Sequence, residues 1–312
     1  MTAWCPAYRF RMADTQIKRV VSSERAALTG LLVNAGLAGA KLIAGIVGHS
    51  FALVADAVES MVDIAGSLIV WRALEYGAKP PDESHPFGHG KVESLAGLAV
   101  GLLVVIAGVG IGLQSVHGIM NPHRVPAWYT VVVLLGVILV KEIMFRVTRH
   151  AARASASSAG MADAWHHRSD AITSAAALIG ISIALIGGAA YAPADDWAAL
   201  FASGVIVVNG FLLARAPLGE LLDASQPEIA RRCGEVVLEI EGIRAIEQCE
   251  ARKVGRGYRV IMHAEVDPEL SVAAAHALTG KAKALVRERL PEVASLLIHV
   301  EPWEGEAIGS GQ

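Results

Sequence analysis

The hydrophobic positions of this chain gather into six long runs that are separated by short polar stretches. A hydrocarbon core of roughly 30 Å is crossed by about twenty apolar residues in a helix. The runs reach that length, so the pattern predicts six membrane-spanning helices. We expect them at about residues 26–48, 51–74, 92–116, 127–147, 159–188 and 196–216.

The pattern changes after about residue 217, where hydropathy falls and shorter amphipathic segments follow in the order helix, strand, strand, helix, strand. In the second strand-like segment, apolar Val260 and Met262 alternate with Arg259 and His263, as on a half-buried strand. The predicted fold class is therefore an all-α six-helix membrane domain followed by a small α+β domain of αββαβ order. The expected boundaries are 1–25 for a cytoplasmic N-terminal segment, 26–216 for the transmembrane domain, 217–304 for the cytoplasmic domain and 305–312 for a disordered tail.

Composition supports a membrane protein. Hydrophobic residues make up 54% of the chain, charged residues 18%, and the mean hydropathy is +0.46, whereas soluble proteins carry about a quarter charged residues. The net charge of −3 implies no basic nucleic-acid surface, and the three scattered cysteines suggest no disulfide framework. The chain lacks a Walker A glycine loop and an HExxH motif, so ATP-driven pumping and zinc-dependent proteolysis are not expected.

Lysine and arginine residues orient the predicted helices. They gather before the first span and in the loops after the second and fourth spans, whereas the other loops carry almost none. Because basic loops stay in the cytoplasm, both termini are expected there. Two lysines fall within predicted spans. Lys41 could extend its side chain to the membrane interface, but its mid-span position favours an ion pair or a contact inside the helix bundle. Lys141 is expected to anchor its helix near the cytoplasmic end.

The second and fifth spans share a motif, ADAVESMVD at 55–63 and ADAWHHRSD at 162–170. It offers Glu59 with Asp63 and His166 with Asp170, and each pair is spaced i, i+4 on one helix face. An ionised carboxylate within a span costs about 3 kcal/mol and normally faces a partner or a water path. Two such faces supply four ligands, which suits Zn²⁺ and does not exclude Fe²⁺, Co²⁺, Cd²⁺ or Mn²⁺.

The charge of this predicted site suggests a mechanism. Three carboxylates and a neutral imidazole leave a formal charge of −1 with a divalent metal and −3 without it, so the metal-free site favours proton uptake. A site that holds either metal or protons predicts a metal/proton antiporter. Two alternatives stay open: a membrane metal sensor or assembly factor that binds without transport, and a passive cation channel whose flux ignores a proton gradient.

Over about residues 20–303 the chain resembles the cation diffusion facilitator family of bacterial divalent-metal efflux transporters. The resemblance is carried by the six spans, the paired motif and the block PPDESHPFGHGKVESLAGL at 80–98. It implies a homodimer in the bacterial cytoplasmic (inner) membrane, with a metallochaperone-like cytoplasmic domain, that exports Zn²⁺ or a similar ion against inward proton flow. Lipid, protons and the divalent ion are its expected partners, and no cofactor beyond bound metal is implied.

The resemblance also assigns residues. The transport site falls on Glu59, Asp63, His166 and Asp170, although many zinc-type members have Asp or His in place of Glu59. A second site, in the loop after the second span, falls on Asp82, His85 and His89; the two histidines are also i, i+4 if that loop is helical. In the cytoplasmic domain the implied metal ligands are His263, His276, His299 and Glu301, with Glu247 and Cys249 less expected.

Overall fold

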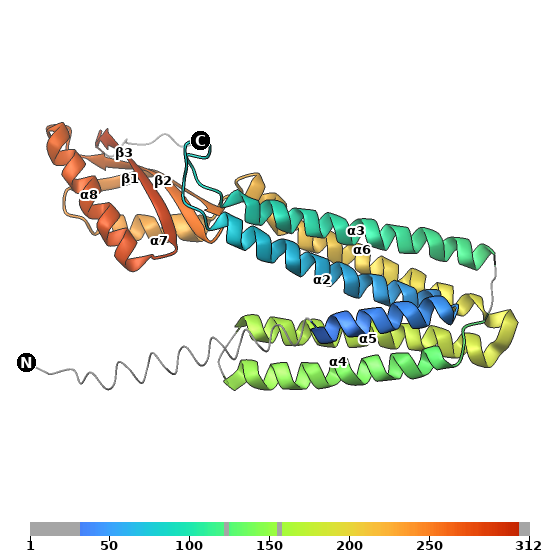
Figure 1. The fold of residues 1–312 in the computed structure, drawn as a ribbon. Helices are drawn as coiled ribbons and strands as arrows, with labels where there is room; N and C mark the ends of the chain where they lie inside the picture. Colours follow the sequence, from blue (N-terminus) through green and yellow to red (C-terminus); the bar gives the residue numbers. More distant parts are fainter. Residues whose placement is uncertain (1–31, 122–124, 155–157, 306–312) are drawn as a thin grey trace, which may run out of the picture. The chain divides into compact units, whose positions relative to one another are not determined.

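The computed structural model describes residues 32–121, 125–154 and 158–305, so the predicted N-terminal segment lies outside the described part. The first described helix runs over Leu32–Val47. It is followed by α2 (Phe51–Gly77), α3 (Lys91–Met120), α4 (Tyr129–Ala154), α5 (Ser158–Gly187), the 3₁₀ turn η1 (Gly188–Tyr191), α6 (Pro193–Leu221), α7 (Pro227–Leu238), β1 (Ile243–Val254), β2 (Gly257–Val266), α8 (Val272–Arg289) and β3 (Val293–Pro302) (Figure 1).

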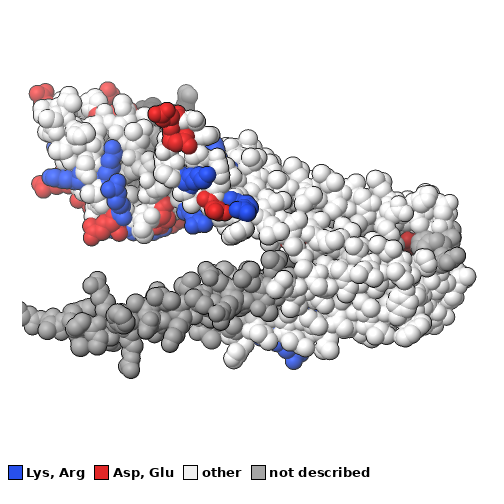
Figure 2. Space-filling model, in the orientation of Figure 1, with Lys and Arg blue, Asp and Glu red and all other residues white. Residues whose placement is uncertain are grey.

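The described residues of each of the six apolar runs form a helix, which confirms the predicted helical membrane domain. Within the described residues, three helical stretches are long and apolar enough to cross a membrane by length and composition, namely α3, Asp170–Tyr191 at the end of α5 and into η1, and α6. Helices α2 and α4 carry more charged side chains, and the described Leu32–Val47 is short. On the face drawn in Figure 2 the helices are almost free of charge, whereas charged side chains gather over the C-terminal domain.

The chain divides into two compact units, and the division crosses helices. The first unit holds residues up to Leu68 and Gly101–Phe211; the second holds Ile69–Val100 and residues from Leu212 onward. The second unit therefore contains the loop between α2 and α3 together with the C-terminal domain. The predicted loop site and the predicted C-terminal site belong to this one unit.

A core of small and branched apolar side chains joins the helices of the first unit. It includes Leu53 of α2, Ile111 of α3, Leu134 of α4 and Ile181 of α5, all 6% exposed or less. Asp195 of α6 fixes the start of α2, because its buried carboxylate accepts hydrogen bonds from the Ser50 hydroxyl at 2.8 Å and from the backbone N–H groups of Phe51 and Ala52. Such a cap satisfies the free N–H groups of a helix start.

The C-terminal domain is a two-layer α+β structure with the predicted element order. Its sheet has the strand order β1-β2-β3, with β1 antiparallel and β3 parallel to β2. The predicted alternation of β2 is confirmed, since Val260, Met262 and Ala264 are buried. They share a core with Val237 of α7 and Val286 of α8, so both helices pack on the same face of the sheet. The opposite face carries His263.

Two cysteines of this domain are buried in its core or beside it, which predicts low reactivity. Burial raises the pKa of the Cys233 thiol to about 11 and that of the Cys249 thiol to about 11, and the Cys249 Sγ donates to the Ala230 carbonyl at 3.3 Å. Because thiolate is the reactive form, iodoacetamide at pH 7.5 is expected to label both at least about 100-fold more slowly in the folded protein than after unfolding. Mass spectrometry of a Cys5→Ser variant measures this, and equal rates would contradict it.

Candidate functional site

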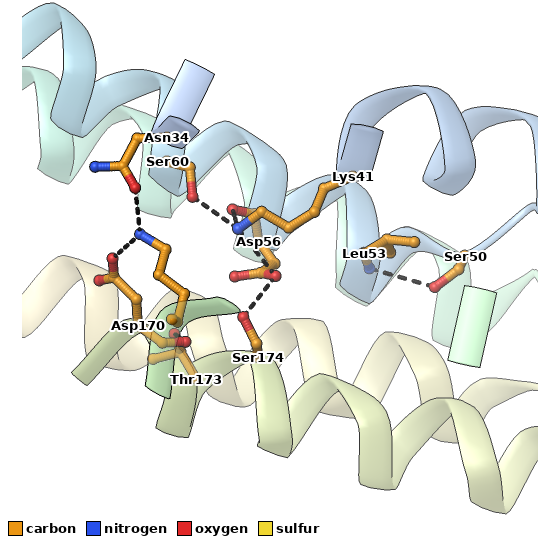
Figure 3. A network of polar contacts seen from close by, with 10 residues as sticks. Asn34, Lys41, Ser50, Leu53, Asp56, Ser60, Asp170, Thr173 and Ser174 are labelled. Atoms are coloured by element: carbon orange, nitrogen blue, oxygen red, sulfur yellow. Dashed lines mark hydrogen bonds and ion pairs between the residues drawn. The ribbon is translucent and has the colours of Figure 1, made fainter. Parts of the chain in front are cut away.

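A buried hydrogen bond joins helices α2 and α5 close to their shared motif (Figure 3). Asp56, the first aspartate of the α2 motif, accepts a hydrogen bond from the Ser174 hydroxyl of α5 at 2.9 Å. It also pairs with Lys41 on the first helix, whose ammonium lies 3.1 Å from the Asp56 carboxylate and donates to Ser60 at 2.7 Å. Lys41 is fully buried. The prediction that Lys41 pairs inside the bundle is therefore confirmed.

Asp170, the last residue of the α5 motif, is also buried and ion-paired. The Lys141 ammonium of α4 lies 2.6 Å from its Oδ2 and donates a second hydrogen bond to the Asn34 side-chain oxygen at 2.9 Å. Lys141 is only 3% exposed. The expectation that Lys141 anchors its helix at the cytoplasmic end is wrong, because its aliphatic stem points into the bundle and brings the charge to Asp170.

The other predicted transport ligands lie on the same two helices. Glu59 and Asp63 are half-buried on α2, and the Glu59 charge is repelled by Asp56, Asp63 and Asp170. Among the described side chains, Glu59, Asp63 and Asp170 do not form a three-ligand group with ligand atoms within 4.8 Å of one another. His166 belongs to α5, but its side chain lies outside the described part of the structure. The four-ligand site stays a prediction.

The loop between α2 and α3 brings Asp82, His85 and His89 together. Their ligand atoms lie within 4.8 Å of one another; His85 Nδ1 is 3.2 Å and His89 Nε2 is 3.3 Å from the Asp82 carboxylate. The helical spacing considered for the two histidines is wrong, because the segment is a turn. Asp82 accepts the His85 backbone N–H at 2.7 Å, and Gly88 adopts a φ of +76°, a left-handed conformation that glycine adopts readily.

His89 is the buried member of this loop group. Its ring meets Tyr76 edge-on at 5.0 Å between centroids, and its side chain is 4% exposed. The buried Nδ1 of His89 has no hydrogen-bond partner among the described residues. A buried, unsatisfied ring nitrogen costs about 1–3 kcal/mol; the other ring nitrogen, Nε2, faces Asp82, and either nitrogen of a neutral imidazole can bind a metal. The observation supports a cation at this site but leaves its occupancy a prediction.

Metal binding at the loop group is expected to weaken as pH falls through the histidine range. The hydrogen bond from the His85 backbone lowers the pKa of Asp82 despite an opposing effect of desolvation, so this carboxylate stays ionised. Imidazoles bind metal only when neutral, so protons compete with the metal for His85 and His89. The Zn²⁺ affinity that the His89→Ala variant lacks should fall as the pH is lowered, by about tenfold per pH unit for each proton that the metal displaces. Competition titration measures it; a decline that starts only near pH 4 would contradict the assignment.

The C-terminal sheet holds a third group on its open face. The His263 Nδ1 lies 2.7 Å from the Glu301 carboxylate, and His299 Nε2 lies 3.5 Å from the same oxygen. His263 pairs with His299 in the β2–β3 register, which explains why the two rings are 5.1 Å apart. His299 and Glu301 are two residues apart on β3, so they lie on the same face of the strand. His276 lies exposed on α8 and does not join this described group.

Glu247, the less expected residue, completes this group, because Glu247, His263 and Glu301 bring their ligand atoms within 4.8 Å of one another. The β1–β2 register shifts between Ile246 and Gln248. A bulge lets two residues of one strand face one residue of the other, and this brings Glu247 to the face of His263. Its hydrogen bond with Glu301 and the charge of Glu301 raise the pKa of Glu247; the hydrogen bonds from Glu247 and His263 lower the pKa of Glu301.

Comparisons with known proteins match both parts of the chain. Residues 27–222 match a family described as the cation efflux transmembrane domain, and residues 226–303 match the cytoplasmic domain of cation efflux proteins. The manganese efflux system protein MneP of Bacillus subtilis is 29% identical over 286 residues, covering 90% of this chain and 96% of MneP. The cation-efflux pump FieF of Pectobacterium atrosepticum is 29% identical over 259 residues, covering 81% and 84%.

A plant relative is longer. The metal tolerance protein C1 of Arabidopsis thaliana is 30% identical over 293 residues, which cover 88% of this chain but 61% of that protein. This chain therefore corresponds to a little under two thirds of the plant protein's length.

Proposed function

The chain belongs to the cation efflux family of divalent-metal transporters, and from this premise we propose that it exports a divalent transition metal from the cytoplasm in exchange for protons. The metal would bind near the middle of the membrane to Glu59, Asp63, His166 and Asp170. We further propose that the protein is a homodimer in a cytoplasmic membrane, with both termini in the cytoplasm. The observation that carries the proposal is the buried polar assembly linking the two motif helices.

Energetics support a functional role for that assembly. Ionisable groups inside a membrane bundle are costly and mark ion paths or proton relays. Here Asp56 and Asp170 are 6% and 8% exposed, and each is held by a lysine from another helix. Because apolar side chains would fill the same space at lower cost, the charges are best explained by a charged substrate.

The donor set bears on the metal. Carboxylate oxygens suit Mn²⁺ and Fe²⁺, whereas an imidazole and tetrahedral geometry suit Zn²⁺. Three carboxylates with one imidazole lie between these preferences. We expect Zn²⁺ to be the substrate. Mn²⁺ is the second candidate, because the relative MneP is named as a manganese efflux system protein. Proton exchange follows from the repulsion among the carboxylates, which favours protons at the site whenever the metal leaves.

The two groups in the second unit are proposed to regulate transport. Glu247, His263 and Glu301 offer three ligands, whereas Zn²⁺ prefers four. The remaining position is available to a residue of a second copy, so metal would draw two cytoplasmic domains together. Size-exclusion chromatography with light scattering would detect metal-dependent compaction or dimerisation, and its absence in a His263→Ala variant would support this role.

Reconstitution into proteoliposomes tests the transport proposal. Uptake of Zn²⁺, Mn²⁺, Fe²⁺, Co²⁺ and Cd²⁺ would be measured with and without a pH gradient for the wild type and for Asp63→Asn. Glu75→Gln is the matched control, because Glu75 is an exposed carboxylate of the same helix, paired with Arg72 at 3.3 Å. Gradient-driven flux that Asp63→Asn removes and Glu75→Gln retains would support the antiporter. Binding without flux would favour a metal sensor, and flux indifferent to the gradient would favour a channel.

A further inference from the structure

Lys141 contacts two different acceptors inside the bundle, one charged and one neutral. Its ammonium lies 2.6 Å from the Asp170 carboxylate and 2.9 Å from the Asn34 side-chain oxygen, with only 3% of the residue exposed. The three groups come from α4, α5 and the first helix, as Figure 3 shows for Asn34 and Asp170. A buried ammonium requires a partner at all times, since an unpaired charge in such a place is strongly destabilising. The Asn34 oxygen is a second, neutral acceptor that Lys141 contacts at the same time as Asp170.

Charged side chains of both signs surround the predicted transport site. Asp56, Glu59, Asp63 and Asp170 contribute four formal negative charges, and the buried Lys41 and Lys141 contribute two positive ones. If all four carboxylates are ionised, the formal charge of these six side chains is −2. The sequence-based count of −3 omitted Asp56 and both lysines.

We infer that Lys141 is a tethered counter-cation that pairs with Asp170 when the transport site holds no metal and shifts to Asn34 when metal binds. The inference rests on the proposed function, in which Asp170 is a metal ligand. A metal–carboxylate bond of about 2.0–2.2 Å places a divalent ion beside the carboxylate that Lys141 contacts. Repulsion between the two cations then favours the neutral acceptor. Lys141 is in this sense a positioning residue, which competes with the metal for Asp170.

The competition makes release possible. A carboxylate-rich site without an internal cation would hold a divalent ion tightly, and transport requires binding that is also weak enough for the ion to leave. Lys141 stabilises the metal-free state because its ammonium pairs with the Asp170 carboxylate as the ion departs. Asn34 stabilises the metal-bound state by accepting the displaced ammonium.

Two substitutions are expected to change metal affinity in opposite directions. Lys141→Met removes the competitor, so equilibrium binding of Zn²⁺ or Mn²⁺ to the purified full-length protein should tighten about 10- to 100-fold, while maximal flux in proteoliposomes falls. Asn34→Leu removes the second acceptor, so the affinity should weaken about tenfold. Lys141→Arg keeps the charge and should stay near wild type. Arg146→Met is the matched control, because it also removes one positive charge from α4, but at an exposed position.

Thermal unfolding separates this role from simple structural support. Without metal, Lys141→Met should lower the Tm; with saturating Zn²⁺ the Tm should rise by more than in wild type, because the metal replaces the lost cation. Asp195→Asn also removes a buried charge, but Asp195 caps the start of α2 through Ser50, Phe51 and Ala52, so its metal-induced Tm rise should equal that of wild type. If Lys141→Met does not fold, Lys141→Gln, which keeps a donor for Asp170, must show the same tightening.

The outcomes distinguish the inference from its premise. If the wild type transports metal but Lys141→Met and Lys141→Gln bind it with unchanged or weaker affinity, the counter-cation inference is overturned and the proposed transport function stands. A wild type that neither binds nor transports any of these ions overturns the proposed function and the inference with it. Tightening in the lysine variants and weakening in Asn34→Leu support both.

Discussion

Asp170→Ala is expected to abolish metal flux, reducing gradient-driven uptake into proteoliposomes at least about 100-fold, since even outer-shell changes cost 10- to 100-fold. Asp170 is the buried carboxylate at which the proposed metal site, α5 and Lys141 meet. Asp170→Asn preserves the shape and loses the charge, and it should be equally inactive. Retention of half or more of the wild-type flux in either variant would remove Asp170 from the transport site.

The same variant should lose stability for a separate reason. Asp170→Ala leaves the Lys141 ammonium with the neutral Asn34 oxygen in place of a carboxylate, and breaking a buried ion pair from one side costs about 3–5 kcal/mol. The double variant Asp170→Ala/Lys141→Met removes both charges and should recover most of this loss without recovering flux. Unfolding in detergent and flux in proteoliposomes, measured on the wild type, the two single variants and the double variant, form a double-mutant cycle. Recovery of flux in the double variant would contradict the assignment of Asp170 as a ligand.

Lys41→Met is the second change with a large expected effect, and its effect is on stability. The Lys41 ammonium is fully buried and lies 3.1 Å from Asp56 and 2.7 Å from the Ser60 hydroxyl. Its removal leaves the Asp56 carboxylate inside the bundle with the Ser174 hydroxyl at 2.9 Å, so the free energy of unfolding should fall by about 3–5 kcal/mol. Thermal or denaturant unfolding of the purified protein measures the loss.

A matched double variant checks that the loss arises from the unpaired charge. Lys41→Met/Asp56→Asn removes both charges, and the amide oxygen that Asp56→Asn introduces still accepts the hydrogen bond from Ser174. The double variant should therefore be more stable than Lys41→Met alone. If the two losses simply add, the ion pair contributes no coupling energy and the lysine acts only through its volume.

The predicted helices follow from local patterns and agree with the structure because burial in a membrane or in a core imposes those patterns. The αββαβ order of the C-terminal domain was predictable for the same reason: the alternation from Val260 to Met262 is visible residue by residue. The shared motif of α2 and α5 was visible as a repeat. Spacing on a helix also placed Glu59 above Asp63 and His166 near Asp170 without any tertiary information.

The pairing of the lysines was only partly predictable. Hydropathy marks Lys41 and Lys141 as unusual, but which carboxylate each one meets depends on how separate helices pack. Lys141 was expected at the cytoplasmic end, yet a four-carbon stem reaches several ångströms from its backbone position, and it ends at Asp170. Distance along the chain gave no signal for this contact, because 29 residues separate the two.

Backbone irregularities limited the other two groups in a similar way. The loop histidines His85 and His89 come together through a turn capped by Asp82 rather than through a helix. Glu247 is the unpaired residue of a register shift and lies beside Gln248, which pairs with His263. A shift of one residue in a strand reverses the side on which a side chain lies. The sequence pattern of β1 does not predict where this shift occurs.

By itself, the sequence determined the helical membrane segments, the order of elements in the C-terminal domain and the residue types available as ligands, because these depend on periodicity and composition over neighbouring residues. Only the tertiary structure decided which charges neutralise one another, which loop residues converge and which acid joins the sheet group. Those outcomes depend on helix packing, turn geometry and strand register, in which displacements of a few ångströms between residues distant in the chain select one partner over another.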